Sequence, residues 1–338
     1  MRVFFASDIA GNTGPSNANR DFCENWPACD ELRTCSHTGK LLKAVEAVFN
    51  SLWCDVAITC SPSIVEEIAF YITKARGKAF VGFCHGYAPY ENEINRLGLS
   101  EKQLNRFVNW LYKCDVVATN SELQKHFLIS REPSLAGKVV TTMLGFERFP
   151  MAEKQVSNVE GEGRVRIVAV SGGTRPIKGN EIVAKAVSIL QERGIAIKLK
   201  IYGRRYSKNL KLDSLISSCG VYMGQVSQSQ LARELRETDV FVMNSRHESF
   251  GLSAIDALKA GCSVLLSNNC GVKEVFSTEP CDVISNNEDA EEVADKIEAL
   301  FLEPNNKRLY ETINFEMCDW TAVAKRFRAA CSDVIEKK

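Results

Sequence analysis

Short, almost continuously apolar stretches alternate along the chain with longer stretches in which apolar residues recur every three or four positions. The first pattern is typical of strands buried on both faces of a parallel sheet, and the second of helices that cover such a sheet. In the first half of the chain, strands are predicted at 3–9, 55–60, 79–84, 115–120 and 139–144. Helices are predicted between them, around 39–52, 62–75, 100–113 and 121–129. This alternation predicts an α/β fold with a doubly wound parallel sheet.

The alternation stops at residues 151–164, which are polar and contain Gly161 and Gly163. A second series of strands then begins, at 165–171, 195–202, 221–226, 239–245, 263–268 and 282–286. Two helical patterns, 288–303 and 320–335, close the chain. We therefore predict the following division: a first domain at 1–150, a linker at 151–164, a second domain at 165–318 and a final helix at 319–338. Two doubly wound domains of this kind face each other across a cleft, and ligands bind at the carboxyl ends of the strands.

Composition narrows the class of protein. The 338 residues are 45% apolar and 25% charged, as expected of a globular chain of two domains. Lys and Arg (42) balance Asp and Glu (42), so the basic excess typical of nucleic-acid binding is missing and no nucleic-acid partner is predicted. No apolar run is long enough to span a membrane, and the thirteen cysteines form no CxxC pair. These features favour a cytoplasmic protein with reduced thiols.

Residues 240–271 contain the strongest chemical signal. They read as strand, polar loop, helix and strand, with Glu248 in the loop and Asp256 eight positions later in the helix. The turn formed by Ser249, Phe250, Gly251 and Leu252 opens that helix, and unbonded N–H groups at a helix start bind phosphate. Carboxylates beside them can accept hydrogen bonds from sugar hydroxyls. The segment therefore suits both halves of a nucleotide-sugar, and Arg246 and His247 beside it are further candidates to line the cleft.

This segment resembles the retaining group-1 glycosyltransferases, family four of the GT-B fold. Their hallmark is a Glu, seven residues, and a second Glu or a near relative, which here are Glu248 and Asp256. The second acid is one methylene shorter than the family's usual Glu. The resemblance implies two Rossmann-like domains and a final helix that crosses back to the first domain, beginning here near Trp320. It also implies that Glu248 binds the donor sugar's hydroxyls and Asp256 the ribose.

The loop 171–180, SGGTRPIKGN, follows the first strand of the second domain. Gly172 and Gly173 allow a ligand to approach the backbone closely, and Arg175 and Lys178 are cations that could stabilise a leaving diphosphate. Family members have Arg and Lys on this loop. Two solvated surface cations are the alternative interpretation.

Two candidates lie in the first domain. Gly14 belongs to a polar turn that opens a helix, a setting that suits a phosphate or is simply a turn. His85 follows a strand, where the family often has a His near the transferred sugar. A satisfied structural histidine is the alternative interpretation.

The resemblance implies a retaining glycosyltransferase that moves a sugar from a UDP- or GDP-linked donor to an acceptor hydroxyl. No DxD triplet occurs, so we expect no metal and no other cofactor. We expect the acceptor to be a glycan or a lipid-linked glycan of bacterial surface polysaccharide synthesis. The same analogy predicts a peripheral contact with the inner face of the membrane.

Two alternatives stay open at this point. The chain could be a non-catalytic GT-B-like subunit that binds a nucleotide-sugar, which the Asp at position 256 and the altered Gly203-Arg204-Arg205 turn would suit. It could also be a nucleotide-sugar epimerase or a phosphorylase on the same fold. The chain has only four histidines and no legible pyridoxal lysine, and both observations argue against that second alternative.

Overall fold

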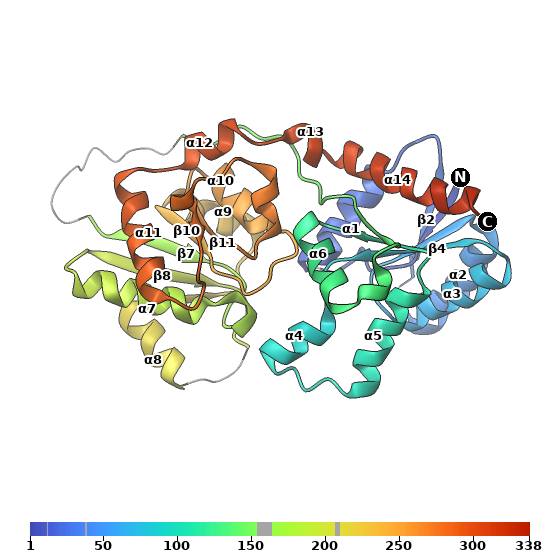
Figure 1. Cartoon of the computed structure of the whole chain (residues 1–338), viewed down its shortest axis with the longest axis horizontal. Helices are drawn as coiled ribbons and strands as arrows, with labels where there is room; N and C mark the ends of the chain where they lie inside the picture. The colour runs from blue at the N-terminus through green and yellow to red at the C-terminus, as the bar shows by residue number, and fades with distance from the viewer. Residues whose placement is uncertain (12, 38, 154–163, 207–209) are drawn as a thin grey trace. The chain divides into compact units, whose positions relative to one another are not determined.

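The computed structural model describes residues 1–338 except 12, 38, 154–163 and 207–209. It consists of two compact units (Figure 1). The first unit comprises Met1–Arg148 and Phe315–Lys338, and the second comprises Phe149–Asn314. Most of the predicted linker, 151–164, lies outside the described residues.

The first unit has a six-stranded sheet in the order β2-β1-β3-β4-β5-β6, with every pair parallel. Its strands are β1 (Arg2–Phe5), β2 (Glu31–Thr34), β3 (Val56–Thr59), β4 (Ala79–Cys84), β5 (Val116–Thr119) and β6 (Val139–Thr141). The sequence did not predict β2, because this edge strand has no apolar run and alternates between exposed and half-buried residues. The other five lie within or beside the predicted ranges.

Helices cover this sheet on both faces (Figure 1). They are α1 (Gly14–Glu24), α2 (Lys40–Trp53), α3 (Ile64–Ala75), α4 (Ala88–Asn95), α5 (Glu101–Lys113), α6 (Glu122–Arg131), η1 (Pro133–Leu135), α13 (Phe315–Cys318) and α14 (Trp320–Glu336). Polar side chains begin several of these helices by accepting a hydrogen bond from a backbone amide in the first turn. Ser63 begins α3 in this way, and Ser100 with Gln103 forms a capping box on α5.

The second unit has a six-stranded parallel sheet in the order β12-β11-β10-β7-β8-β9. Its strands are β7 (Arg166–Val170), β8 (Ile197–Tyr202), β9 (Gly220–Gly224), β10 (Val240–Met243), β11 (Ser263–Ser267) and β12 (Val283–Ile284). Its helices are η2 (Pro176–Lys178), α7 (Asn180–Glu192), α8 (Leu210–Cys219), α9 (Gln228–Arg236), α10 (Leu252–Lys259), η3 (Gly271–Val275), η4 (Pro280–Asp282), α11 (Ala290–Leu302) and α12 (Asn306–Glu311).

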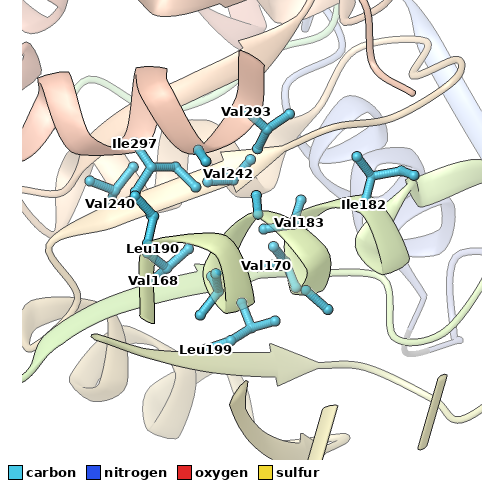
Figure 2. Close-up of a cluster of buried hydrophobic side chains, with 14 of the residues drawn as sticks. Val168, Val170, Ile182, Val183, Leu190, Leu199, Val240, Val242, Val293 and Ile297 are labelled. Carbon is cyan, nitrogen blue, oxygen red and sulfur yellow. The ribbon is translucent and has the colours of Figure 1, made fainter. Parts of the chain in front are cut away.

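Branched apolar side chains fill the space between this second sheet and the helices α7 and α11. Figure 2 shows Val168, Val170 and Val242 of the central strands pointing toward Val183 of α7 and Val293 of α11. All five are fully or almost fully buried. Because β-branched residues suit a strand covered by helices, the apolar runs of the sequence fold as a buried parallel sheet. The α/β class with two doubly wound sheets is thus confirmed.

The last helix, α14, belongs to the first unit. The ring of Trp320 lies against the backbone of Gly145, where an added Cβ would overlap the indole. Further along, Phe327 packs on Phe22 and Phe83, with ring centroids 5.0 and 5.2 Å away. The chain therefore returns at its C-terminus to the core formed by its first strands.

Each sheet has one place where the direction of winding reverses. In the first sheet the chain proceeds from β1 to β2 on one side and then to β3 on the other. In the second sheet the strands β7, β8 and β9 follow one direction, and β10 starts the other. Loops that leave such neighbouring strands diverge, and the space between them at the carboxyl ends is where open α/β sheets bind ligands.

Candidate functional site

The β7/β10 switch point of the second sheet is the candidate site. The loop 171–179 leaves β7, and the loop 244–251 leaves the neighbouring strand β10. Most of the predicted site residues lie on these two loops. Sheet topology thus brings together two segments that are about seventy positions apart in the sequence, the separation of Lys178 from Glu248.

The backbone of the β7 loop is held close to its neighbours. Gly172 and Gly173 have positive φ angles of 85° and 66°, a region that glycine adopts without strain. A side chain on Gly173 would overlap the carbonyl of Arg204, and one on Gly203 would lie 2.6 Å from the amide nitrogen of Gly173. A ligand can therefore approach this backbone without meeting a side chain from either glycine.

Asn180 fixes the other end of this loop. Its Nδ2 donates to the carbonyls of Ser171 and Gly173, at 2.9 and 2.7 Å. The side chain is 4% exposed, so these bonds are sheltered from water. Sequence reasoning missed Asn180 because it treated this residue only as the start of a helix.

Lys178 and Glu248 form an ion pair at the centre of the site, between the Lys Nζ and the Glu Oε2. Their side chains are only 18% and 17% exposed. Burial raises the pKa of Glu248, but the positive charges of Lys178, His247 and Arg175 outweigh it, and the net pKa lies below the ordinary value. Glu248 is therefore ionised near neutral pH. From the sequence, Lys178 was expected to bind the diphosphate and Glu248 the sugar hydroxyls. A contact between the two residues was not predicted.

Arg175 precedes the short helix η2 with an extended backbone. Within the part of the chain that the structure describes, its guanidinium makes no hydrogen bond or ion pair, although its charge helps to lower the pKa of Glu248. Arg175 is thus a half-buried cation beside Glu248 with all of its donors available. That is what an anionic ligand would need.

The turn 249–252 presents the start of α10. Glu248 is held by its backbone, whose N–H donates to Asn269 and whose carbonyl accepts from Gly271. Gly251, with φ of 116°, is the N-cap residue of α10, and no side chain in the described part of the chain caps this helix. Phe250 is 1% exposed, so only its backbone can contact a ligand. The amides of Leu252 and the next residue therefore remain available to an anion.

Asp256 lies in the second turn of α10 and is half-buried. Burial raises the pKa of its carboxyl, and the nearby charge of Lys259 only partly opposes this. Among the described residues its carboxyl has neither a hydrogen bond nor an ion pair. A desolvated carboxyl in this state is stabilised by any ligand that brings hydroxyl donors.

Arg246 has a structural role. Its guanidinium pairs with Glu181 at 2.7 Å and Glu288 at 2.6 Å, and it donates to the carbonyl of Pro176. These contacts join the β10 loop to the β7 loop and to the start of α7. The neighbouring His247 is buried, and its charge acts on Glu248. Arg246 is therefore already engaged by protein groups, unlike Arg175.

Gly14 and His85 belong to the first unit, so they are described separately from the β7/β10 site. Gly14 is the first residue of α1, and open space surrounds its Cα. The loop before it is closed by Asp8, whose carboxylate accepts from the amides of Ala10 and Gly11 and from Ser16 Oγ. Thr13 caps α1. Amides that an anion would use are thus partly occupied by a carboxylate.

His85 lies between two asparagines. Its Nε2 is 2.8 Å from Asn19 Oδ1, and its Nδ1 is 3.4 Å from Asn120 Nδ2. Asn19 Nδ2 donates to the carbonyl of Asp8, so its Oδ1 must accept and His85 Nε2 must donate. Burial lowers the pKa of His85 to about 4. His85 is therefore a neutral imidazole at physiological pH, suited to hydrogen bonding and not to protonating a leaving group.

Glu66, which the sequence did not single out, lies near the β1/β3 switch point. Its Oε1 accepts from Ser7 Oγ at 2.8 Å and from the amide of Ser61 at 3.3 Å. Its Oε2 is buried without a partner among the described residues, and the side chain is 3% exposed. Burial raises the pKa of Glu66 to about 7, against the opposing effect of the serine donors. A lone Glu inside a helical pattern gives no sequence signal for this.

Comparison with known proteins agrees with this geometry. The sequence profile of the family described as "Glycosyl transferases group 1" matches residues 153–313, which include both loops of the site. Residues 153–313 are thus similar in sequence to this family. The predicted resemblance is thereby confirmed for the second unit. Lys178 and Glu248, both within the matched residues, meet at the switch point of the second sheet.

Relatives of known activity match part of the chain. The D-inositol 3-phosphate glycosyltransferase of Arthrobacter sp. (strain FB24) is 30% identical over 142 residues, which cover 40% of this chain and 34% of that protein. The GDP-mannose:cellobiosyl-diphosphopolyprenol alpha-mannosyltransferase of Xanthomonas oryzae pv. oryzae (strain PXO99A) is 32% identical over 105 residues, or 30% and 28% of the two chains. The chain thus matches about a third of the length of these relatives.

Solved structures match the whole chain. Anabaena Alr3699/HepE in complex with UDP and glucose has a TM-score of 0.72 at 13% identity, covering 98% of this chain and 100% of that one. Sucrose-phosphate synthase (tll1590) from Thermosynechococcus elongatus has a TM-score of 0.70 at 16% identity, covering 100% and 99%. At this identity the likeness concerns the fold, which is GT-B.

No group of three or more His, Cys, Asp or Glu side chains that could hold a metal ion occurs among the described residues. In the same part of the chain, no helix is long and apolar enough to cross a bilayer.

Glu66 should make stability depend on pH in an unusual direction. Its folded-state pKa of about 7 lies above the ordinary 4.5, so the folded protein holds a proton that the unfolded chain releases. Stability should therefore fall as pH rises from about 5 to 8, by on the order of 3 kcal/mol. Glu66→Gln should remove this fall, as measured by urea unfolding at several pH values. Glu67→Gln, at an exposed neighbour, is the control. The same fall in both variants would show that Glu66 does not cause it.

Proposed function

We propose that the protein is a retaining, metal-independent glycosyltransferase that moves a sugar from a nucleotide-sugar to an acceptor hydroxyl. The observation that supports this best is the half-buried Lys178–Glu248 ion pair at the β7/β10 switch point, beside the start of α10. A carboxylate for sugar hydroxyls, a cation for phosphate and free amides lie on adjoining loops. Few ligands other than a nucleotide-sugar use all three.

The diphosphate would bind between the β7 loop and α10. The amides at Leu252 and beyond supply hydrogen-bond donors and the positive end of the helix dipole. Gly172 and Gly173 let the phosphates reach the backbone, and Arg175 contributes a cation with available donors. Because charge develops on the diphosphate as the glycosidic bond breaks, these groups stabilise the transition state more than the ground state.

Binding of the donor would exchange partners within the Lys178–Glu248 pair. Lys178 would turn its ammonium toward phosphate, and Glu248 would accept from hydroxyls of the transferred sugar. Asp256, whose carboxyl has no hydrogen-bond partner among the described residues, would accept from the ribose. In this exchange Lys178 and Glu248 would each lose one hydrogen bond and gain another, so neither charge would be left without a partner.

Retention of the anomeric configuration would follow from attack on the same face as the leaving group. The leaving phosphate would accept the proton of the acceptor hydroxyl as the new glycosidic bond forms. The group-1 family is the support for this step.

The donor base and the acceptor are inferred from relatives. One curated relative is named for GDP-mannose and a polyprenol-linked acceptor, and one solved relative contains UDP. We infer a UDP- or GDP-linked donor and a glycan or lipid-linked acceptor of bacterial surface polysaccharide synthesis. Such an acceptor would place the protein in the cytoplasm, at the inner face of the membrane.

A non-catalytic subunit that binds a nucleotide-sugar is the second candidate. Asp256 favours it, because its carboxyl reaches one methylene less far than the family's Glu. Slow hydrolysis of a donor by the purified protein would exclude this alternative, because a binding subunit has no turnover.

Arg175→Ala and Lys178→Ala should each weaken binding of free UDP or GDP by roughly tenfold or more, the cost of a charged hydrogen bond. Isothermal titration of both nucleotides measures this directly. Lys200→Ala is a matched control, since Lys200 forms a similarly buried pair with Glu234 in the same unit. If the two site variants bind as tightly as the wild type, the β7 loop does not hold the diphosphate.

Glu248→Gln should lower kcat/KM by roughly tenfold to a hundredfold, because an amide accepts sugar-hydroxyl bonds more weakly than a carboxylate. It should not weaken diphosphate binding, since Lys178 is then released from its ion pair. Glu234→Gln breaks the matched Lys200 pair and should cost stability without costing turnover. Unchanged kinetics in Glu248→Gln would remove this residue from the site.

Transfer should continue in excess EDTA. Each helix start offers about half a positive charge, and Arg175 and Lys178 add two cations, so a divalent ion is not needed to balance the diphosphate. Initial rates with and without chelator are the measurement. Loss of activity that a divalent metal restores in proportion to its occupancy would contradict the proposed mechanism.

A further inference from the structure

Helix α2 (Lys40–Trp53) has its large apolar side chains on the outside. Leu41, Leu42, Val45, Phe49 and Leu52 are exposed to fractions of 79, 54, 45, 66 and 49%. With 3.6 residues per turn, these positions and the similarly exposed Val48 fall within an arc of about 120°. We call these six residues the α2 stripe. A single exposed Leu needs no explanation, but a continuous stripe on one helix does.

The opposite face of α2 shows that the stripe is not a packing surface of the fold. The buried residues of this helix are Ala47, Asn50 and Ser51, which are small or polar. The helix therefore packs on the first unit through its small and polar residues, and its large apolar residues are exposed. If α2 only packed on the core, its large apolar side chains would face inward and its small or polar side chains would face outward.

Cations without carboxylate partners accompany the stripe. In the described part of the chain, Lys40, Lys43 and Arg33 form no ion pair, and Arg33 lies 3.9 Å above the ring of Trp53 at the end of α2. Burial raises the pKa of Glu46, the one acid of this helix, but hydrogen bonds from the Ser36 hydroxyl and from the amides of His37 and Ser36 outweigh it and hold the pKa at about 2. Three cations thus stand against one carboxylate among these residues near the stripe.

The neighbouring helix α3 also exposes large apolar side chains. The two helices pack against each other, and α3 exposes Ile64 and Tyr71 to 65 and 63% (Figure 1). Even so, eight side chains fall well short of the roughly 20–30 residues a side that a standard protein interface uses. A second copy of the chain is therefore a poor match in area, whereas a lipid surface needs only a shallow apolar insertion with cations beside it.

We propose that the α2 stripe binds an anionic lipid surface, with α2 lying in the plane of the interface. The apolar side chains would enter the boundary of the acyl chains, while Lys40, Lys43 and Arg33 would meet the headgroup charges. This deepens the proposed function, because it names the surface by which the protein reaches a lipid-linked acceptor. It does not depend on sugar transfer.

Co-sedimentation with vesicles tests the proposal. The wild type should bind vesicles of equal parts phosphatidylcholine and phosphatidylglycerol more tightly than vesicles of phosphatidylcholine alone. The double variant Leu41→Glu, Phe49→Glu should lower the partition coefficient at least about tenfold, since two apolar groups are lost and two repelled charges gained. Lys40→Gln with Lys43→Gln should remove most of the preference for the anionic vesicles.

Leu302→Glu is the matched control. Leu302 is 80% exposed on α11 of the second unit, so this change adds the same charge at an equally exposed apolar position outside the stripe. It should bind vesicles as the wild type does. Thermal unfolding and UDP or GDP titration of every variant should match the wild type, because none of the exchanged residues is buried and all lie outside the β7/β10 site. A defect in transfer with intact vesicle binding would count against the proposed function alone.

Three results would overturn the proposal. The wild type could fail to bind either kind of vesicle, or the stripe variant could bind as well as the wild type. Sedimentation velocity could also show a wild-type dimer that the stripe variant dissociates, with no vesicle binding by either protein. That last result would assign the α2 stripe to a second copy of the chain.

Discussion

A parallel sheet covered on both faces must change its direction of winding somewhere, and this constraint governs the arrangement described above. In the second unit the reversal lies between β7 and β10. The loops on either side diverge, and hydrogen bonds within the sheet cannot fill the space between them. Lys178 and Glu248 meet there across the two strand ends. The location of the site thus follows from how the sheet is connected, before any property of its side chains is considered.

The fold was largely predictable because the strands are buried on both faces and therefore appear as apolar runs. The exception is β2, an edge strand whose alternating exposure gives no such run. The glycines, cations and acids of the candidate site were also predictable, since they follow strands at the carboxyl edge. Partners were not. Nothing local in the sequence indicates that Lys178 pairs with Glu248.

Long-range pairing also explains the residues that sequence reasoning left uncertain. Arg246 adjoins Glu248 in the sequence, yet Glu181 and Glu288 hold it as a brace between loops. Arg175 looks like an equivalent cation but has no such partners among the described residues. Glu66 is a further example, because its raised pKa depends on burial under loops from two other strands. Charge type can be read from sequence, but whether a charge is free depends on the tertiary structure.

The contact between Gly173 and Gly203 joins the β7 loop to the turn that follows β8. Neither residue has room for a side chain, and the amide of Gly173 donates to Tyr202 at the end of β8. The β7 loop and the turn containing Arg204 and Arg205 are therefore held together through their backbones. Changes in that turn, whether by evolution or by design, would shift the loop bearing Arg175 as well. Under the proposed function, a substitution at the β8 turn would therefore also change how the β7 loop holds the diphosphate.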